Sequence, residues 1–205
     1  MHVVAMLFTC CPDKISITTS LLKEGRSCMA LPIMDNSQRY GAISRLLHWG
    51  MALLFAWQFT SATAHWLFPD TPFEEFFWGT HYPVGVLLLT LVVLRAIWAL
   101  ANASRRPPSV SVMAKLGHLV LYGLMMVIPT IALIRQYGSG RSLEVFGFTL
   151  MSGFEGEEIT WMTDLGGLLH GELGWTLLAL IVGHIVMAIL HRKLTHHDVL
   201  TRMAR

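Results

Sequence analysis

Four long apolar segments dominate this sequence, at residues 44–66, 81–100, 114–134 and 168–190. A helix needs about 20 mostly apolar residues to cross the roughly 30 Å hydrocarbon core of a bilayer. The composition agrees with such a role: 54% of the residues are hydrophobic and only 14% are charged, whereas soluble domains carry about 25% charged residues. The sequence therefore predicts an all-α membrane protein, a bundle of four transmembrane helices.

The charges of the connecting segments predict the orientation of these helices, because Lys and Arg favour cytoplasmic loops. The connection after the second segment and the C-terminal tail are basic. The first and third connections carry most of the carboxylates: Asp70, Glu74, Glu75, Glu144, Glu155, Glu157, Glu158 and Asp164. This alternation places both termini in the cytoplasm. The long third connection, about 135–167, is expected to form an ordered cap on the outer side.

The first 33 residues differ from the rest of the chain and contain all three cysteines, Cys10, Cys11 and Cys28. We expect residues 1–33 to be a disordered extension or the product of a wrongly assigned start at a codon before Met34. The domain then covers residues 34–205. Without cysteine this domain cannot use a disulfide, an iron–sulfur cluster or a covalent haem attachment. The net charge of +2 and the absence of a nucleic-acid motif exclude a nucleic-acid partner.

Four histidines stand at matched depths in the predicted spans. His48 lies near the inner end of the first span, His81 opens the second at the outer side, and His170 and His184 bracket the fourth. Fourteen residues advance a helix by about 21 Å and rotate it by about 1400°, within about 40° of whole turns. Both histidines of the fourth span therefore face one side of the helix, one near each membrane surface.

This arrangement predicts two cofactors stacked across the bilayer. His48 and His184 share the inner half, and His81 and His170 share the outer half. Each pair can supply the two axial nitrogens of a low-spin haem b, which carries electrons and binds no exchangeable ligand. Glycines one turn after a histidine, Gly85 and Gly174, would let a flat macrocycle approach the backbone; the alternative is that they serve helix packing.

Two other histidines compete with these four. His65 is turned about 100° away from the face of His48 and is ranked below His81 as a ligand. His118 begins the third span near the inner side and could replace His48 as a ligand. It could also bind a quinone or a haem propionate. Hydrogen-bonded packing or proton relay remains the alternative for any single histidine.

Arginines near the span ends are candidates for pairing with haem propionates. Arg95 lies near the inner end of the second span and Arg135 near the outer end of the third. Either side chain could instead extend to the lipid headgroups. Arg39 and Arg45 are interpreted as anchors at the inner surface. His118, Lys115 and Arg95 gather at the inner end and form a candidate quinone site, because quinone reduction needs protons and hydrogen-bond donors.

The sequence resembles the bacterial cytochrome b561 family, dihaem four-helix membrane proteins related to the cytochrome b subunits of nickel–iron hydrogenases. The resemblance runs from Arg39 to Met203. It is carried by the motifs RYGAISRLLHW, HYPVGVLLLTLVVLR, KLGHLVLYGLMMVIP and LLHGELGWTLLALIVGH and by the closing HHDVLTRM.

The resemblance implies a multi-pass protein of the bacterial inner membrane with two non-covalent b haems. It implies His48, His81, His170 and His184 as their axial ligands. It further implies electron transfer to or from ubiquinone in a respiratory chain. Some family members oxidise superoxide at the outer face, an activity that the acidic outer connections of this chain disfavour, because they repel an anion.

Three other functions are alternatives to electron transfer by a stand-alone cytochrome. The chain could be a membrane-anchoring haem subunit of a dehydrogenase or hydrogenase, fed by a periplasmic donor or partner subunit. A transporter or proton channel would need acid–base chains across the spans, which the sequence lacks. A di-metal enzyme would need more carboxylates than Glu172 among the histidines. Electron transfer is the function the histidine pattern favours.

Overall fold

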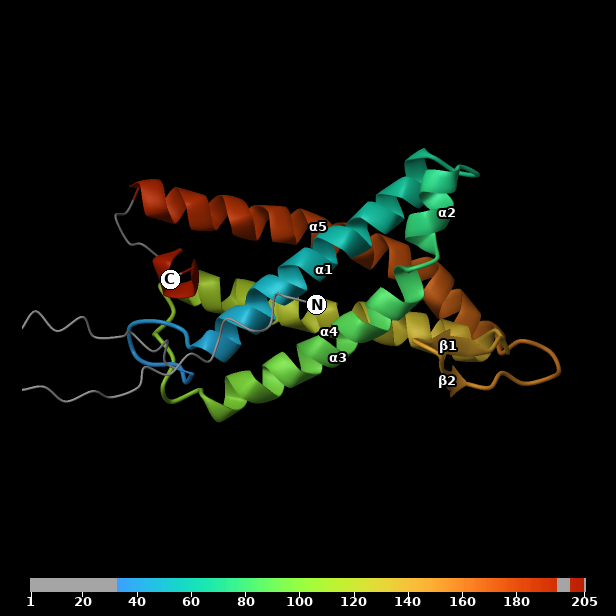
Figure 1. Ribbon diagram of the computed structural model, residues 1–205, viewed down its shortest axis with the longest axis horizontal. Helices are drawn as coiled ribbons and strands as arrows, with labels where there is room; N and C mark the ends of the chain where they lie inside the picture. The colour runs from blue at the N-terminus through green and yellow to red at the C-terminus, as the bar shows by residue number, and fades with distance from the viewer. Residues whose placement is uncertain (1–32, 195–199, 205) are drawn as a thin grey trace, which may run out of the picture. The chain divides into compact units, whose positions relative to one another are not determined.

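The computed structural model describes residues 33–194 and 200–204 (Figure 1). These residues form four long helices: α1 (Ala42–Leu67), α3 (His81–Ala101), α4 (Val112–Gly138) and α5 (Thr160–Leu194). Two short helices, α2 (Pro72–Trp78) and α6 (Thr201–Ala204), and two strands, β1 (Leu143–Val145) and β2 (Phe148–Met151), complete the described fold. The extension expected at residues 1–33 lies outside the described residues except for Ile33.

Three helical segments of the described chain are long and apolar enough to cross a membrane: Pro72–Ala101, Val112–Gly138 and Thr160–Lys193. They correspond to the second, third and fourth predicted spans. α1 has 26 residues and covers the first predicted span, but Gln58, Thr60 and Ser61 interrupt its apolar run. The fold is thus mostly helical, as predicted, and membrane-embedded helices place the protein in a lipid bilayer.

The long helices pack as two pairs, α1 against α3 and α4 against α5, and α3 also contacts α4. The outer parts of α4 and α5 approach closely because glycines stand at the contact. A Cβ on Gly166 would overlap the side chain of Arg135, and one on Gly138 would overlap Met162. This close packing fixes α5, which carries His170 and His184, against α4.

Capping side chains set where two helices begin. The Ser111 side chain accepts a hydrogen bond from the backbone N–H of Ala114 and starts α4. Thr71 accepts from the N–H of Glu74 and starts α2, where Pro72 occupies a first-turn position that needs no N–H donor. α2 connects α1 to α3, which begins at His81.

A β-hairpin lies in the connection between α4 and α5, where an ordered cap was expected. β1 and β2 pair antiparallel around Phe146 and Gly147, both of which have positive φ angles, 53° and 81°. Two such residues form the type I′ turn that favours a two-residue hairpin. The prediction of an all-α fold missed this small sheet. An aromatic residue rarely adopts a positive φ, so nothing in the sequence indicated the turn.

A buried carboxylate ties the inner end together. Asp35 is 3% exposed and accepts hydrogen bonds from the N–H of Gly41 at 2.8 Å and the hydroxyl of Ser44 at 2.7 Å. Its second oxygen pairs with Arg106 Nε at 3.0 Å, and Trp98 donates to Ser44. The segment before α1 is thereby fastened to α3 and to the loop that follows it.

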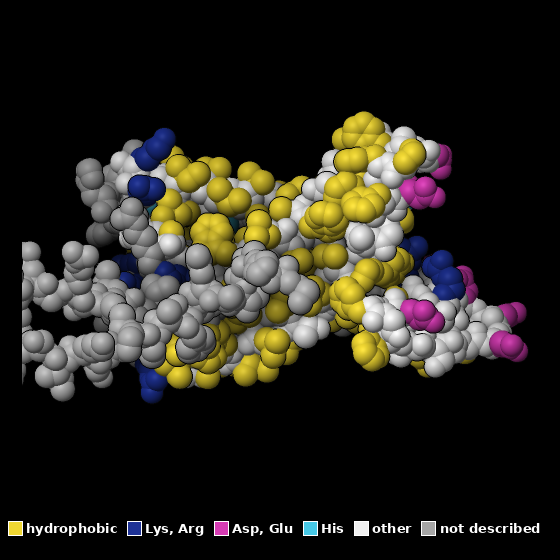
Figure 2. All heavy atoms as spheres, in the orientation of Figure 1, with side chains coloured by type: hydrophobic (Ala, Val, Ile, Leu, Met, Phe, Trp, Pro, Cys, Tyr) yellow, Lys and Arg dark blue, Asp and Glu magenta, His cyan; other side chains and the backbone are white. Residues whose placement is uncertain are grey.

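Charged side chains separate toward the two ends of the helices. In Figure 2 most Lys and Arg side chains gather at the end where α1 starts and α6 lies, and the Asp and Glu side chains gather at the end with α2 and the hairpin. Hydrophobic side chains cover the length between them. This is the distribution expected of a bundle embedded in lipid.

Candidate functional site

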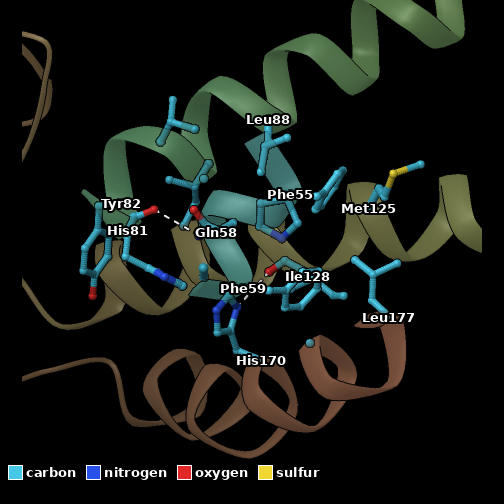
Figure 3. Close-up of a pocket in the computed structure, with 16 residues that line it drawn as sticks. Phe55, Gln58, Phe59, His81, Tyr82, Leu88, Met125, Ile128, His170 and Leu177 are labelled. Atoms are coloured by element: carbon cyan, nitrogen blue, oxygen red, sulfur yellow. Dashed lines mark hydrogen bonds between the residues drawn. The ribbon is translucent and has the colours of Figure 1, made fainter. Parts of the chain in front are cut away.

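His81 and His170 come together at the outer end of the helices. His81 is the first residue of α3, and His170 lies on α5. Their ring centroids are 6.2 Å apart and the ring planes make an angle of 77°. Both side chains line one cavity and point into it (Figure 3). The structure thus brings together the two histidines that were paired by depth.

A buried serine orients the ring of His81. Ser61 on α1 is 0% exposed, and its hydroxyl donates to the backbone oxygen of Gln58 at 2.7 Å. The Ser61 hydroxyl oxygen lies 2.7 Å from His81 Nδ1. With its single hydrogen given to Gln58, the hydroxyl can accept from Nδ1–H, and Nε2 of a neutral His81 is then the nitrogen left for a ligand.

His170 is held in the same protonation pattern by a backbone group. Its Nδ1 lies 3.2 Å from the backbone oxygen of Ile128 on α4, which can only accept (Figure 3). Nδ1 must donate, so Nε2 is again unprotonated. A hydrogen bond from one ring nitrogen commonly orients a metal-binding histidine and raises its basicity. Both residues of the outer pair have this arrangement.

The cavity beside this pair is almost wholly apolar. It opens to the outside and is lined by residues of all four long helices. α1 contributes Phe55 and Phe59, and α5 contributes Gly174 and Leu177. A Cβ added to Gly174 would meet nothing within 4 Å. The helix therefore presents open space to a flat ligand at this point.

His65 takes no part in the outer pair. Its ring stacks on Trp78 at a centroid distance of 3.8 Å, and its Nδ1 lies 2.7 Å from a Glu74 carboxylate oxygen. The side chain is half exposed. Trp78 in turn packs beside His81, with ring centroids 4.7 Å apart. His65 thus packs against Trp78, which contacts His81, and it lies outside the pair formed by His81 and His170.

Three of the described histidines lie close together toward the inner end. The rings of His118 on α4 and His184 on α5 have centroids 5.2 Å apart at an angle of 80°. His118 Nδ1 donates to the backbone oxygen of Ala114 at 2.6 Å. His48 lies within electrostatic range of both. The structure therefore brings His48, His118 and His184 together, and it does not indicate which two of them would bind one metal ion.

Arg95 distinguishes His48 from the other two. Its guanidinium donates to His48 Nδ1 at 2.9 Å and lies over the Tyr122 ring. Because arginine cannot accept, His48 Nδ1 carries no proton here, and the proton of the neutral ring sits on Nε2. His48 can offer Nε2 to a metal only after Arg95 releases Nδ1.

The remaining predicted site residues lie near the two clusters. Arg135, at the outer part of α4, is exposed and within electrostatic range of His170. Lys115 is exposed and lies one turn before His118 on α4. The geometry is consistent with the positions assigned to both residues, although nothing in the structure engages them with a ligand.

Comparison with known proteins identifies the fold family. The family model described as prokaryotic cytochrome b561 matches residues 39–205. The chain belongs to the prokaryotic cytochrome b561 family. It is 29% identical over 177 residues to cytochrome b561 homolog 2 of Escherichia coli (strain K12), a match that covers 82% of this chain and 93% of that protein.

Membership of the cytochrome b561 family means that this chain is a membrane cytochrome that binds haem b and transfers electrons. The outer pair fits such a group. The side chains of His81 and His170 point into one largely apolar cavity with ring centroids 6.2 Å apart, so both imidazoles could bind the iron of such a group.

Two residues that orient His81 were not predicted from the sequence. Ser61 and Gln58 on α1 both bond to His81, Ser61 through the ring and Gln58 Nε2 through the backbone oxygen at 3.1 Å. Their polar side chains within an apolar span could have indicated this role, because burying polar groups in a membrane costs free energy and usually serves a function. Trp78 and Glu74 were not singled out because they lie in a loop that folds into α2.

Replacement of Ser61 by alanine should weaken haem binding about 10-fold, because loss of a group that orients a ligand costs 10–100-fold in affinity. The measurement is transfer of haem to apomyoglobin, followed by absorbance. Ser61→Thr retains the oxygen and should bind almost normally. Thr60→Ala is the control, since the Thr60 hydroxyl is exposed and bonds only to Ala56 within α1. Equal haem transfer from Ser61→Ala and Thr60→Ala would show that Ser61 does not orient His81.

Proposed function

We propose that this chain carries electrons across the bacterial inner membrane between two b haems. His81 and His170 would hold the outer haem, and His48 and His184 the inner one. The observation that supports this most strongly is the outer pair, in which both Nδ1 atoms are held and both Nε2 atoms are free. When bound, each haem iron supplies reversible one-electron transfer.

The proposed architecture has α1 as the fourth membrane span, with both termini in the cytoplasm. α1 is 26 residues long and packs along α3. Gln58 Nε2 and Ser61 bond to His81 on α3, while Gln58 Oε1 is buried without a partner among the described residues. α1 can still span a bilayer, because polar groups inside membranes are tolerated where a neighbouring helix supplies partners. The basic end of the bundle would face the cytoplasm.

The inner haem requires a change of partner at Arg95. In the proposed bound state His48 carries its proton on Nδ1 and offers Nε2, so Arg95 must turn away from the ring. A propionate carboxylate is a suitable new partner, because a guanidinium binds carboxylates through two parallel hydrogen bonds. Arg135 would play the corresponding role at the outer haem, beside His170.

The assignment of ligands is tested by single substitutions to alanine. His81→Ala and His170→Ala should each remove the same component from the reduced-minus-oxidised spectrum and leave the other component, because both residues would hold one iron. His65→Ala should keep both components, since its ring stacks on Trp78. Loss of the outer haem in His65→Ala but not in His81→Ala would refute the outer pairing.

At the inner end, His48→Ala and His184→Ala should remove the other component. If His118→Ala removes it and His48→Ala does not, His118 and not His48 is the second inner ligand. The 5.2 Å separation of the His118 and His184 rings makes this comparison necessary.

Ubiquinone is the proposed partner at the inner end. Reduction of a quinone to its quinol consumes two electrons and two protons. His118 is exposed and lies beside His184, so its imidazole could pass protons to a quinone bound at this end. Lys115, one turn away, offers hydrogen-bond donors to a carbonyl oxygen. A separate dehydrogenase or hydrogenase subunit is the alternative electron partner, and its co-purification would favour an anchoring role.

The quinone site predicts a separation of haem binding from quinone reaction. His118→Phe should retain both haem components and slow the oxidation of the reduced haems by a water-soluble ubiquinone analogue at least 10-fold, because proton donation by a positioned side chain contributes about 10²–10⁴. Stopped-flow absorbance measures this rate. Unchanged kinetics would move the quinone site elsewhere, and loss of the inner haem would make His118 a ligand.

A further inference from the structure

Arg45 on α1 has a buried donor without an acceptor. Its Nε is shielded from solvent and has no hydrogen-bond partner among the described residues. A guanidinium is always charged and can only donate. A buried donor left unpaired incurs the full cost of its lost hydration. A carboxylate oxygen within hydrogen-bond distance of Nε would remove this cost.

The position of Arg45 relates it to the inner cluster. It precedes His48 by three residues, so the two side chains are neighbours on the surface of α1. Side chains on a helix tilt toward its N-terminus, and the N-terminus of α1 lies at the basic end of the bundle (Figure 2). The Arg45 side chain is therefore expected to extend from α1 toward the basic end, on the terminal side of His48.

Three other arginines at this end have hydrogen-bond partners in the protein. Arg106 pairs with the buried carboxylate of Asp35 at 3.0 Å. Arg95 donates to His48 Nδ1, and Arg202 donates to the backbone oxygen of Pro108 at 3.3 Å. Within the described part of the chain, no carboxylate is paired with Arg45. A ligand that brings its own carboxylate next to His48 would fit this donor.

We propose that Arg45 binds a propionate carboxylate of the inner haem. The proposal rests on the inner haem of the proposed function and gives Arg45 a cofactor-binding role in place of that of a surface anchor. Haem b carries two propionates, so Arg45 can hold one while Arg95, once it releases His48, holds the other. The buried Nε of Arg45 then gains its acceptor.

Binding of a cation to a propionate changes the reduction potential of the iron. A bare carboxylate stabilises the ferric over the ferrous state because it lies close to the extra positive charge, and a guanidinium offsets this effect. Burial and hydrogen bonding around a haem are established determinants of its potential. Removal of Arg45 should therefore lower the potential of the inner haem and leave the outer haem unchanged.

The test is a spectroscopic redox titration of the purified full chain with its haems. Arg45→Gln should shift the ratio of ferrous to ferric inner haem about tenfold at a given ambient potential, about 59 mV for one electron. Arg45→Lys keeps the charge but loses the two-point geometry, so it should show a smaller shift. Arg105→Gln is the matched control: it removes the same charge from an exposed residue at the same end.

The outcomes separate this proposal from the function it rests on. Two haems per chain with a lowered inner potential in Arg45→Gln alone would support the role of Arg45. Two haems with equal shifts in Arg45→Gln and Arg105→Gln would overturn it and leave the two-haem function intact. Wild-type protein with no inner haem would overturn both. If Arg45→Gln does not accumulate, Arg45→Lys decides: an inner potential equal to that of wild type overturns the proposal.

Discussion

The hydrogen bond from His81 Nδ1 to Ser61 joins the first helix to the cofactor site. It holds the imidazole at the start of α3 and leaves Nε2 unprotonated. His170 reaches the same state through the backbone oxygen of Ile128. These two bonds come from α1 and α4, the helices that do not carry the pair. All four long helices therefore contribute to one centre, and the cavity between them is lined by residues of each.

The two helix pairs explain how the histidines come to face one another. α1 with α3 carries His48 and His81, and α4 with α5 carries His118, His170 and His184. α4 and α5 approach closely at Gly138 and Gly166, and this contact holds the two helices together at the outer end. Along α5 the fourteen-residue spacing places His184 near the inner end, where it lies beside His118. In the proposed function, electrons would pass between haems at these two levels.

The sequence predicted the long helices and the outer pair because apolar length and helical phase depend only on residue order. It could not predict the partners of the ring nitrogens. Ser61 and Ile128 meet the histidines through tertiary packing, and Arg95 reaches His48 from another helix. The hairpin was missed because Phe146 adopts a positive φ that its residue type disfavours. Arg45 was interpreted as an anchor because burial of a single nitrogen atom cannot be inferred from a basic residue near a helix end.

Pyridine haemochrome quantitation against protein concentration, before and after extraction with acidic acetone, determines whether the bundle holds two non-covalent b haems, one at each end of α5. We expect two haems b per chain, all of them extractable, because no cysteine lies within residues 34–205 to form a thioether. One haem per chain, or haem that remains with the protein after extraction, would show that the bundle does not hold two non-covalent haems.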